Sequence, residues 1–227
     1  MQVEEILNYF KKSKDLKAIE GMKKVGINPD FSFGIRIPNL RALAKKIGVN
    51  HFLAVKLWTF GYRETMILAS MIADPKRISE EEIQDILNSP NYNYWEVVDQ
   101  TVMNLFYRLS TISEKIVDWC NDTREFVRRT GFVSIAVLAG KEKSDTINYE
   151  YYAKLLIDGS IDERVNVRNS VSWALRQIGK KSCKLNDFAI SLAYEISLID
   201  SRSSKWIAKD VLKELESLRI KERLKIN

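Results

Sequence analysis

A charged pattern that recurs along the chain constrains its fold more than any other feature. The pattern Asp-x-Arg-x-x-Val-Arg-x-Thr/Ser begins at Asp122 and again, forty residues later, at Asp162. A weaker third copy, Asp-x-Arg, begins at Asp200. A period near forty residues indicates stacked pairs of helices, each of which buries its apolar face against the next pair. In each copy we expect the Asp to cap the second helix of a pair and the Arg to brace a neighbouring turn.

Apolar residues recur at spacings of three and four through nearly the whole chain, without a sustained alternation of period two. This spacing predicts an all-α protein. With the forty-residue repeat, it favours a right-handed α-solenoid of HEAT-like helical repeats with a concave basic groove, formed as a single domain over residues 1–227. We expect the basic tail, 220–227, to fray. The predicted helices begin at about residues 3, 15, 38, 50, 63, 80, 95, 112, 125, 148, 163, 185 and 203.

The composition excludes several kinds of chemistry. Cys120 and Cys183 lie far apart in the sequence, and His51 is the single histidine. We therefore expect no metal site, no cofactor and no nucleophile activated by a Ser–His or Cys–His pair. No apolar run approaches the ~20 residues that cross a membrane, and the acidic N-terminus lacks a signal core, so we predict a cytoplasmic protein without membrane contact.

The charge distribution favours a polyanionic partner. The formal net charge is +6, a moderate excess for a chain of 227 residues. From Arg164 to Lys184 the chain has six basic residues and no acidic residue. A basic stripe of this kind is typical of surfaces that bind nucleic acid, although Lys180, Lys181 and Lys184 can equally form a solvated edge.

Trp95 and Asp99 form the first candidate site. They are four residues apart in a predicted helix, so they share one face of it. An indole offers a flat surface to a sugar or base, and a carboxylate can stabilise a developing cation or orient a water molecule. The alternative is a Trp in the core and an Asp in solvent, which is the more common use of these residues.

Three segments in order resemble the AlkD family of DNA alkylation repair glycosylases, which are all-helical and built from HEAT-like repeats. The first is Asn-Tyr-Trp-Glu-Val-Val-Asp at 93–99, the second is Phe-Val-Arg-Arg at 126–129, and the third is Val-Ser-Trp-Ala-Leu-Arg at 171–176. Gly-Ile-Arg-Ile-Pro at 34–38, followed by Arg41, and Tyr-Arg-Glu at 62–64 are lesser landmarks of the same family. The resemblance runs over most of the chain.

The resemblance implies a glycosylase that removes N3- and N7-alkylated purines, such as 3-methyladenine and 7-methylguanine, from duplex DNA in base excision repair. It implies that Asp99 is the catalytic carboxylate and that Trp95 and Trp173 press on the deoxyribose of the lesion. The enzyme would act as a monomer. The residues expected to bind DNA are Arg128, Arg129, Arg168, Arg176 and Lys180. Asn169 stands where many relatives are basic, and Gly21 stands where some have an aromatic residue.

A second hypothesis is a HEAT-like module that binds nucleic acid or protein without chemistry. In that case Trp95, Asp99 and Trp173 serve packing and capping. On either hypothesis we expect His51 on the surface. We expect the other three tryptophans in the core or in the packing between helix layers, namely Trp58, Trp119 and Trp206.

Overall fold

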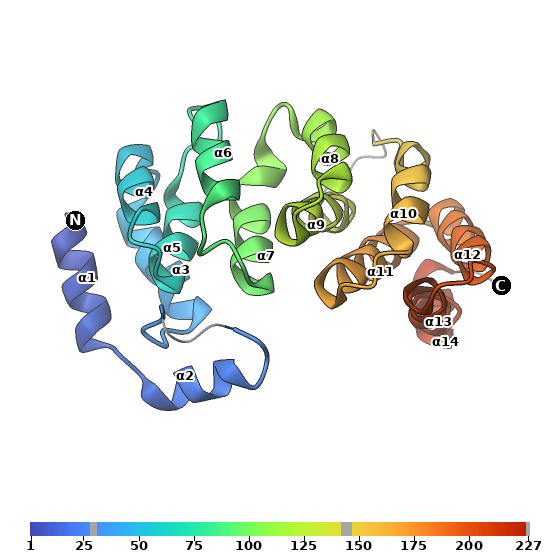
Figure 1. Ribbon diagram of the computed structural model, residues 1–227, viewed down its shortest axis with the longest axis horizontal. Helices are drawn as coiled ribbons and strands as arrows, with labels where there is room; N and C mark the ends of the chain where they lie inside the picture. The colour runs from blue at the N-terminus through green and yellow to red at the C-terminus, as the bar shows by residue number, and fades with distance from the viewer. Residues whose placement is uncertain (28–30, 142–146, 226–227) are drawn as a thin grey trace. The chain divides into compact units, whose positions relative to one another are not determined.

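The computed structural model describes residues 1–27, 31–141 and 147–225. Within these ranges every regular element is a helix, which confirms the predicted all-α class. The chain forms two compact units, Met1–Ser110 and Thr111–Asn227 (Figure 1). The single domain expected over residues 1–227 stays a prediction.

The first unit is arranged around one buried helix, α5. Every residue of α5 except Met71 is buried. It packs against α3, α4 and α7. The helices of this unit are α1 (Val3–Lys12), α2 (Leu16–Lys23), α3 (Ile37–Ile47), α4 (His51–Trp58), α5 (Arg63–Ile72), α6 (Glu80–Asn88), α7 (Trp95–Asn104) and the short 3₁₀ helix η1 (Phe106–Arg108).

The second unit consists of helix pairs stacked side by side (Figure 1). The second helices of successive pairs, α9, α11 and α13, contact one another in that order, and α8, α10 and α12 each contact a helix of this inner row. This is the arrangement predicted from the repeat. The helices are α8 (Ile112–Asn121), α9 (Glu125–Lys141), η2 (Tyr149–Tyr152), α10 (Ala153–Ser160), α11 (Val165–Gly179), α12 (Cys183–Ser197), α13 (Arg202–Leu215) and α14 (Leu218–Leu224).

Several helix ends follow from local chemistry. Asp15 accepts a hydrogen bond from the backbone N–H of Ala18 and caps α2. Ser79 and Glu82 form a reciprocal capping box at the start of α6, as their three-residue spacing indicates. Pro38 occupies the first turn of α3, where its missing N–H is not needed.

The expected capping role of the repeated Asp is wrong. Asp122 and Asp162 lie one turn before their helices, where each accepts a hydrogen bond from the backbone N–H two residues on, at 2.7 and 3.1 Å. A short Asp side chain in a turn satisfies the nearest N–H before the helix begins. The bracing role of the Arg is confirmed for Arg164, which donates to the carbonyl of Thr123 in the preceding repeat at 2.8 Å.

The third copy of the pattern differs from the first two. Asp200 pairs with Lys205 at 2.6 Å, and Ser201 caps α13 by accepting from the backbone N–H of Ser204. The tail is also more ordered than expected, because α14 extends to Leu224 and buries Ile220. Residues 226 and 227 lie outside the described part of the chain.

One of the expected surface and core positions is wrong, that of His51. Trp119 is buried as predicted. Trp206 is 38% exposed, and its ring packs against the guanidinium of Arg168 on α11 at 4.2 Å, which is a contact between helix layers and not a core position. His51 was expected on the surface, yet its side chain is 9% exposed and its Nε2 lies 3.2 Å from Glu82. Trp58 is half-buried.

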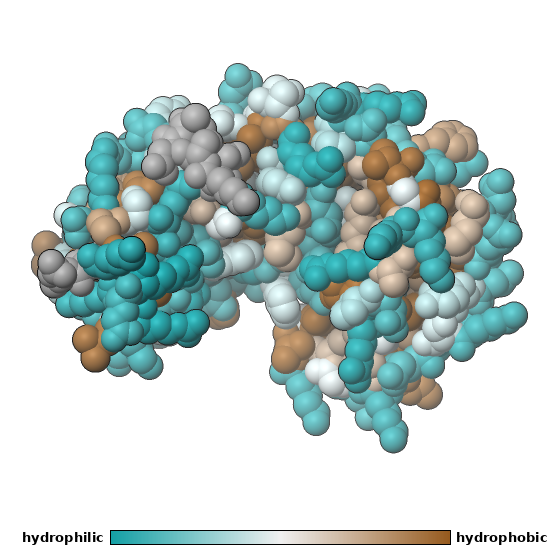
Figure 2. Space-filling view, turned by 180° about the vertical axis from the view of Figure 1, so that it is seen from behind, coloured by the Kyte–Doolittle hydropathy of each residue, from teal (hydrophilic) through white to brown (hydrophobic). Residues whose placement is uncertain are grey.

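The surface drawn in Figure 2 is mostly hydrophilic, and its hydrophobic areas are separated from one another. None of the helices within the described ranges is both long and apolar enough to span a membrane. In the same residues no three His, Cys, Asp or Glu side chains are grouped so that they could hold a metal ion.

Candidate active site and nucleic-acid interface

Helix α7 carries the first candidate pair. Trp95 is its first residue and is half-buried, whereas Asp99, one turn later, is 7% exposed. The indole Nε1–H of Trp95 donates to the carbonyl of Val25 at 2.9 Å, so the ring is held against the segment that follows α2. The unit thus holds a carboxylate shielded from bulk water next to an indole whose orientation is restrained.

A buried charge network positions the start of α7. Arg63 is 2% exposed, and its Nε and Nη2 donate to the two carboxylate oxygens of Glu96 at 2.6 and 2.7 Å. Burial would lower the pKa of Arg63, but the hydrogen bonds and charge of Glu96 raise it above its ordinary value. The guanidinium therefore stays charged and links α5 to the residue next to Trp95.

Glu64 extends this network to the loop before α3. It is fully buried and accepts hydrogen bonds from the hydroxyl of Ser32 and the backbone N–H groups of Phe33 and Ile35, at 2.9, 2.8 and 3.1 Å. Arg63 also donates to Glu64, at 3.0 Å. Each oxygen of the carboxylate is thus satisfied, as a buried charge requires.

The network explains two of the sequence landmarks. The Gly-Ile-Arg-Ile-Pro segment and the Tyr-Arg-Glu segment are joined by Arg63 and Glu64, whose contacts hold the loop and α7 together. Sequence reasoning did not find this link. The available signal was an Arg-Glu pair at the head of an otherwise apolar helix, since such a pair is buried only when its charges are satisfied.

In the second unit, Arg128 and Arg129 lie on α9 and bind the next repeat. Arg128 Nη1 is 3.3 Å from Asp162, which also pairs with Arg164 at 2.6 Å. Arg129 is 6% exposed and donates to the carbonyl of Asn166 at 2.6 Å. Arg129 thus joins α9 to α11, and Arg128 joins α9 to the turn before α11.

On α11, Trp173 is half-buried and Arg176 is paired with α13. Arg176 lies 2.7 Å from Glu214 and 3.3 Å from Asp210. Lys180 shares Glu214, at 2.8 Å. Burial would raise the pKa of Glu214, but its hydrogen bonds with Lys180 and Arg176 hold it below its ordinary value.

These ion pairs neutralise part of the basic stripe that the sequence predicted. The carboxylates that face Arg176 and Lys180 come from α13, outside the acid-free segment, so the stripe itself does not reveal them. Arg168 differs from these two: in the part of the chain that the structure describes, it contacts the indole of Trp206 and forms no ion pair.

A second basic segment was missed in the sequence. Between Lys11 and Lys46 there are ten basic and three acidic residues, an excess that is larger than the net charge of +6 for the whole chain. Lys23 and Lys24 at the end of α2 and Arg36 and Arg41 around α3 are exposed. A count of charges over this segment would have found it, but the acidic residues among the basic ones meant that no acid-free run marked it.

The candidate residues are divided between the two units. Trp95 and Asp99 belong to Met1–Ser110, whereas Trp173 and the five basic candidates belong to Thr111–Asn227. That these groups act on one substrate stays a prediction. The departures Gly21 and Asn169 are both exposed, and a side chain added at Gly21 would enter open space.

Comparison with known proteins identifies the family. A family model described as DNA alkylation repair enzyme matches residues 6–196. No curated protein matches the chain in sequence. A solved structure of "a new family of proteins related to the HEAT-like repeat DNA glycosylases with affinity for branched DNA structures" has a TM-score of 0.79 at 17% identity, covering 95% of this chain and 96% of that chain. This likeness confirms the HEAT-like repeat fold, and the family match over most of the sequence shows that the chain belongs to the DNA alkylation repair enzyme family.

Proposed function

We propose that this protein is a monofunctional DNA glycosylase that releases N3- and N7-alkylated purines, including 3-methyladenine and 7-methylguanine, from duplex DNA in base excision repair. The observation that carries the proposal is the shielded carboxylate of Asp99 one turn from the restrained indole of Trp95. The protein would act in the cytoplasm, as a monomer and without a metal or cofactor.

The chemistry fits a cationic lesion. Alkylation at N3 or N7 places a positive charge on the purine, so the base leaves with the electron pair of the glycosidic bond without prior protonation. Asp99 would stabilise the oxocarbenium-like sugar and orient the water that adds to the anomeric carbon, with the proton of that water passing to the carboxylate or to solvent. The indoles of Trp95 and Trp173 would attract the cationic nucleotide within ~6 Å.

The basic side chains would hold the DNA backbone. Arg128, Arg129, Arg168, Arg176 and Lys180 lie on α9, α11 or immediately after α11. A guanidinium that is already paired can still donate to a phosphate through its remaining N–H groups, because it carries five donors. Such backbone contacts position the duplex without selecting a sequence.

Asp99→Asn tests the catalytic role. We expect single-turnover release of 7-methylguanine from duplex DNA to fall about a hundredfold or more, the scale found when an electrostatic stabiliser is removed. DNA affinity should stay within about twofold, since Asn keeps the size of the side chain and the cationic surface is unchanged. Asp118→Asn, at an exposed position of α8, is the matched control and should release base at the wild-type rate.

Two results would contradict this assignment in different ways. Release by Asp99→Asn at the wild-type rate would exclude Asp99 as the catalytic carboxylate. Failure of the wild-type protein to release either 7-methylguanine or 3-methyladenine would exclude the glycosylase activity itself.

A second candidate function is binding of branched DNA without chemistry. It is favoured by the solved structure of similar fold, whose family is described as having affinity for branched DNA structures. In that case the wild-type protein would bind a four-way junction more tightly than a duplex of equal length and would release no base. Base release that depends on Asp99 would argue against it.

A further inference from the structure

A basic and aromatic stripe on α13 lies outside the proposed glycosylase site. It consists of Arg202, Trp206, Lys209 and Lys213, which follow one another at intervals of four, three and four residues. Residues at these intervals share one face of a helix. All four residues are exposed, so α13 presents this face to solvent. It is called the α13 stripe below.

The aromatic member of the α13 stripe is held by a cation from the neighbouring helix. The guanidinium of Arg168, on α11, lies over the ring of Trp206 at 4.2 Å from the ring centroid. Trp206 is nevertheless 38% exposed, and the exposed area belongs to the part of the indole that Arg168 does not cover. An aromatic ring with a restrained orientation and an accessible surface is a platform on which a nucleobase can stack.

The positive charges of the α13 stripe are not neutralised by the carboxylates around it. Among the described residues, no ion pair involves Arg202, Lys209 or Lys213. The acidic side chains on α13 and in the turns beside it have other partners: Asp210 and Glu214 pair with Arg176, Asp200 pairs with Lys205, Glu163 accepts from the backbone N–H of Ser203, and Glu216 accepts from the hydroxyl of Tyr194. The stripe therefore keeps its cations available for an anionic ligand.

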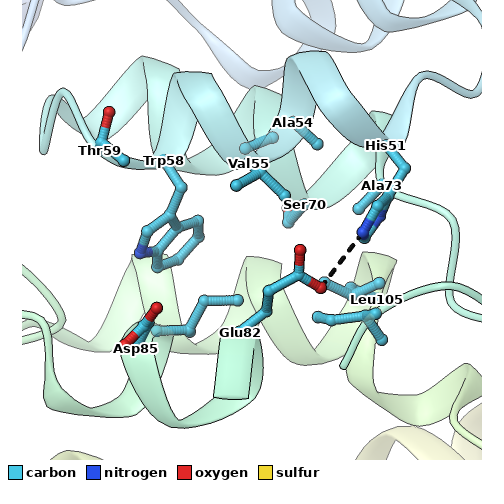
Figure 3. A pocket seen from close by; sticks show the side chains of 13 residues that line it. His51, Ala54, Val55, Trp58, Thr59, Ser70, Ala73, Glu82, Asp85 and Leu105 are labelled. Atoms are coloured by element: carbon cyan, nitrogen blue, oxygen red, sulfur yellow. Dashed lines mark hydrogen bonds and ion pairs between the residues drawn. The ribbon is translucent and has the colours of Figure 1, made fainter. Parts of the chain in front are cut away.

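Trp58 shows that a partly accessible indole alone does not make such a surface. It is half-buried, and its ring lines a pocket between α4 and α6 (Figure 3). Glu82 and Asp85 line the same pocket, and none of its described lining residues is a lysine or an arginine. Two carboxylates without a cation repel a phosphate. The α13 stripe differs because its indole lies among unpaired cations.

We propose that the α13 stripe binds a short segment of single-stranded DNA. One unpaired base stacks on the exposed part of Trp206 and extends the contact of the indole with Arg168. Phosphates on either side of that base are bound by Lys209, Lys213 and Arg202. The stripe spans roughly 17 Å of helix, which is enough for only a few nucleotides.

The indole is what selects a single strand. In an intact duplex the bases are stacked on one another, so their faces are not available to Trp206, and a duplex would meet only the cations of the stripe. The family of the chain makes DNA the expected nucleic acid. None of the four residues of the stripe belongs to the proposed glycosylase site, so this inference does not depend on base release.

The first test separates stacking from charge. It compares two oligomers of about ten nucleotides, an oligothymidylate and an oligomer of the same phosphates without bases, by fluorescence anisotropy. The wild-type protein should bind oligothymidylate about tenfold more tightly or better, because stacking on an aromatic side chain contributes on this scale for each base. Trp206→Ala should weaken binding of oligothymidylate about tenfold and change binding of the base-free oligomer by about twofold at most.

Two further variants show whether the effect belongs to the ring of Trp206. Trp206→Phe keeps an aromatic ring and should lose only about two- to threefold in affinity for oligothymidylate. Tyr194→Ala, at an exposed aromatic position of α12, is the matched control and should bind both oligomers as the wild-type protein does.

Lysine variants test the phosphate contacts. Lys209→Gln and Lys213→Gln should each make the dependence of the logarithm of the association constant on the logarithm of salt concentration shallower by about 0.7, the value for one phosphate of a single strand. Lys205→Gln is the same change on the same helix, and it should have a smaller effect because Lys205 is already paired with Asp200.

Three results would overturn the proposal. They are equal binding of the two oligomers by the wild-type protein, an equal loss of affinity for both oligomers in Trp206→Ala, and equal salt dependences for Lys205→Gln and Lys209→Gln. These experiments use oligomers without alkylated bases and do not measure base release, so failure of this surface and failure of the glycosylase proposal are distinguishable.

Discussion

At the scale of single residues, Gly34 shows how one backbone position can hold a loop next to a helix. Its φ of +78° lies in the left-handed region, and a Cβ at this position would lie 2.2 Å from the backbone carbonyl oxygen of Asp15. The neighbouring N–H groups of Phe33 and Ile35 bind Glu64. The loop can therefore approach both the cap of α2 and the charge network of α5 because residue 34 has no side chain.

We predict that Gly34→Ala destabilises the protein by about 2–4 kcal/mol, from the left-handed conformation and the clash with Asp15 together. Gly26→Ala is the matched control, since φ is +75° there but no atom lies within 4 Å of the added Cβ. That variant should lose about 1–2 kcal/mol of folding stability, which is the cost of placing a residue with a side chain in the left-handed conformation without a clash. Urea unfolding of both variants measures the difference, and equal costs would show that the close approach to Asp15 contributes nothing.

At the scale of elements, ion pairs connect consecutive helices of the second unit. Asp162 forms an ion pair with Arg128 of α9. Glu214 of α13 forms ion pairs with Arg176 of α11 and with Lys180. These contacts join repeats that also pack through apolar side chains. Repeat proteins depend on such nearest-neighbour contacts, because each repeat cannot bury its apolar face alone.

The lowered pKa of Glu214 predicts how the α11–α13 contact depends on pH. A carboxyl whose folded pKa is lowered stabilises the folded state above its unfolded pKa, here 4.5, and this stabilisation is lost as pH falls through the folded pKa. Glu214→Gln should therefore cost roughly 0.5–1.5 kcal/mol at pH 7, the scale of a partly exposed pair, and much less near pH 3. Denaturant unfolding at several pH values measures the difference.

Glu195→Gln, an exposed position on α12, is the control for this experiment. It should show a small and nearly constant difference from wild type over the same range. A cost of Glu214→Gln that does not change between pH 7 and pH 3 would contradict the ionic origin of the contact.

At the scale of the whole molecule, the position of positive charge matters more than its total. The segment from Lys11 to Lys46 has a larger excess of positive charge than the whole chain, and the acid-free segment from Arg164 to Lys184 is partly neutralised by α13. Cations that face carboxylates contribute less to DNA binding than cations that do not, because their charge is already balanced.

We therefore predict different salt dependences for two arginine variants. The logarithm of the DNA association constant falls linearly with the logarithm of the salt concentration, and Arg168→Gln should make this slope shallower by about one. The reason is that Arg168 would neutralise one phosphate without competition from a carboxylate. Arg176→Gln is the same chemical change on the same helix. It should make the slope shallower by a smaller amount, because Arg176 is already paired with Asp210 and Glu214. Fluorescence anisotropy with duplex DNA at several salt concentrations measures both slopes, and equal slopes would contradict this account.

The sequence by itself determined the class of the fold and the local start of many helices. The forty-residue pattern and the three- and four-residue apolar spacing indicated stacked helices. Asp15, Pro38 and Ser79 each act within the first turn of their own helix, so these helix starts depend on local sequence alone. The family resemblance likewise depended on short segments in order, and the family match agrees with it.

The tertiary structure alone decided which charges are paired and which aromatic rings are exposed. Arg63 pairs with Glu96, thirty-three residues away, and Arg176 pairs with Glu214, thirty-eight residues away. Trp206 stays partly exposed, and its ring packs against Arg168 of another helix. Such partners come from different helices, and nothing in local spacing specifies which helices meet. Burial of a charge depends on whether its partner is present at that contact, so this part of the site could be known only after the chain had folded.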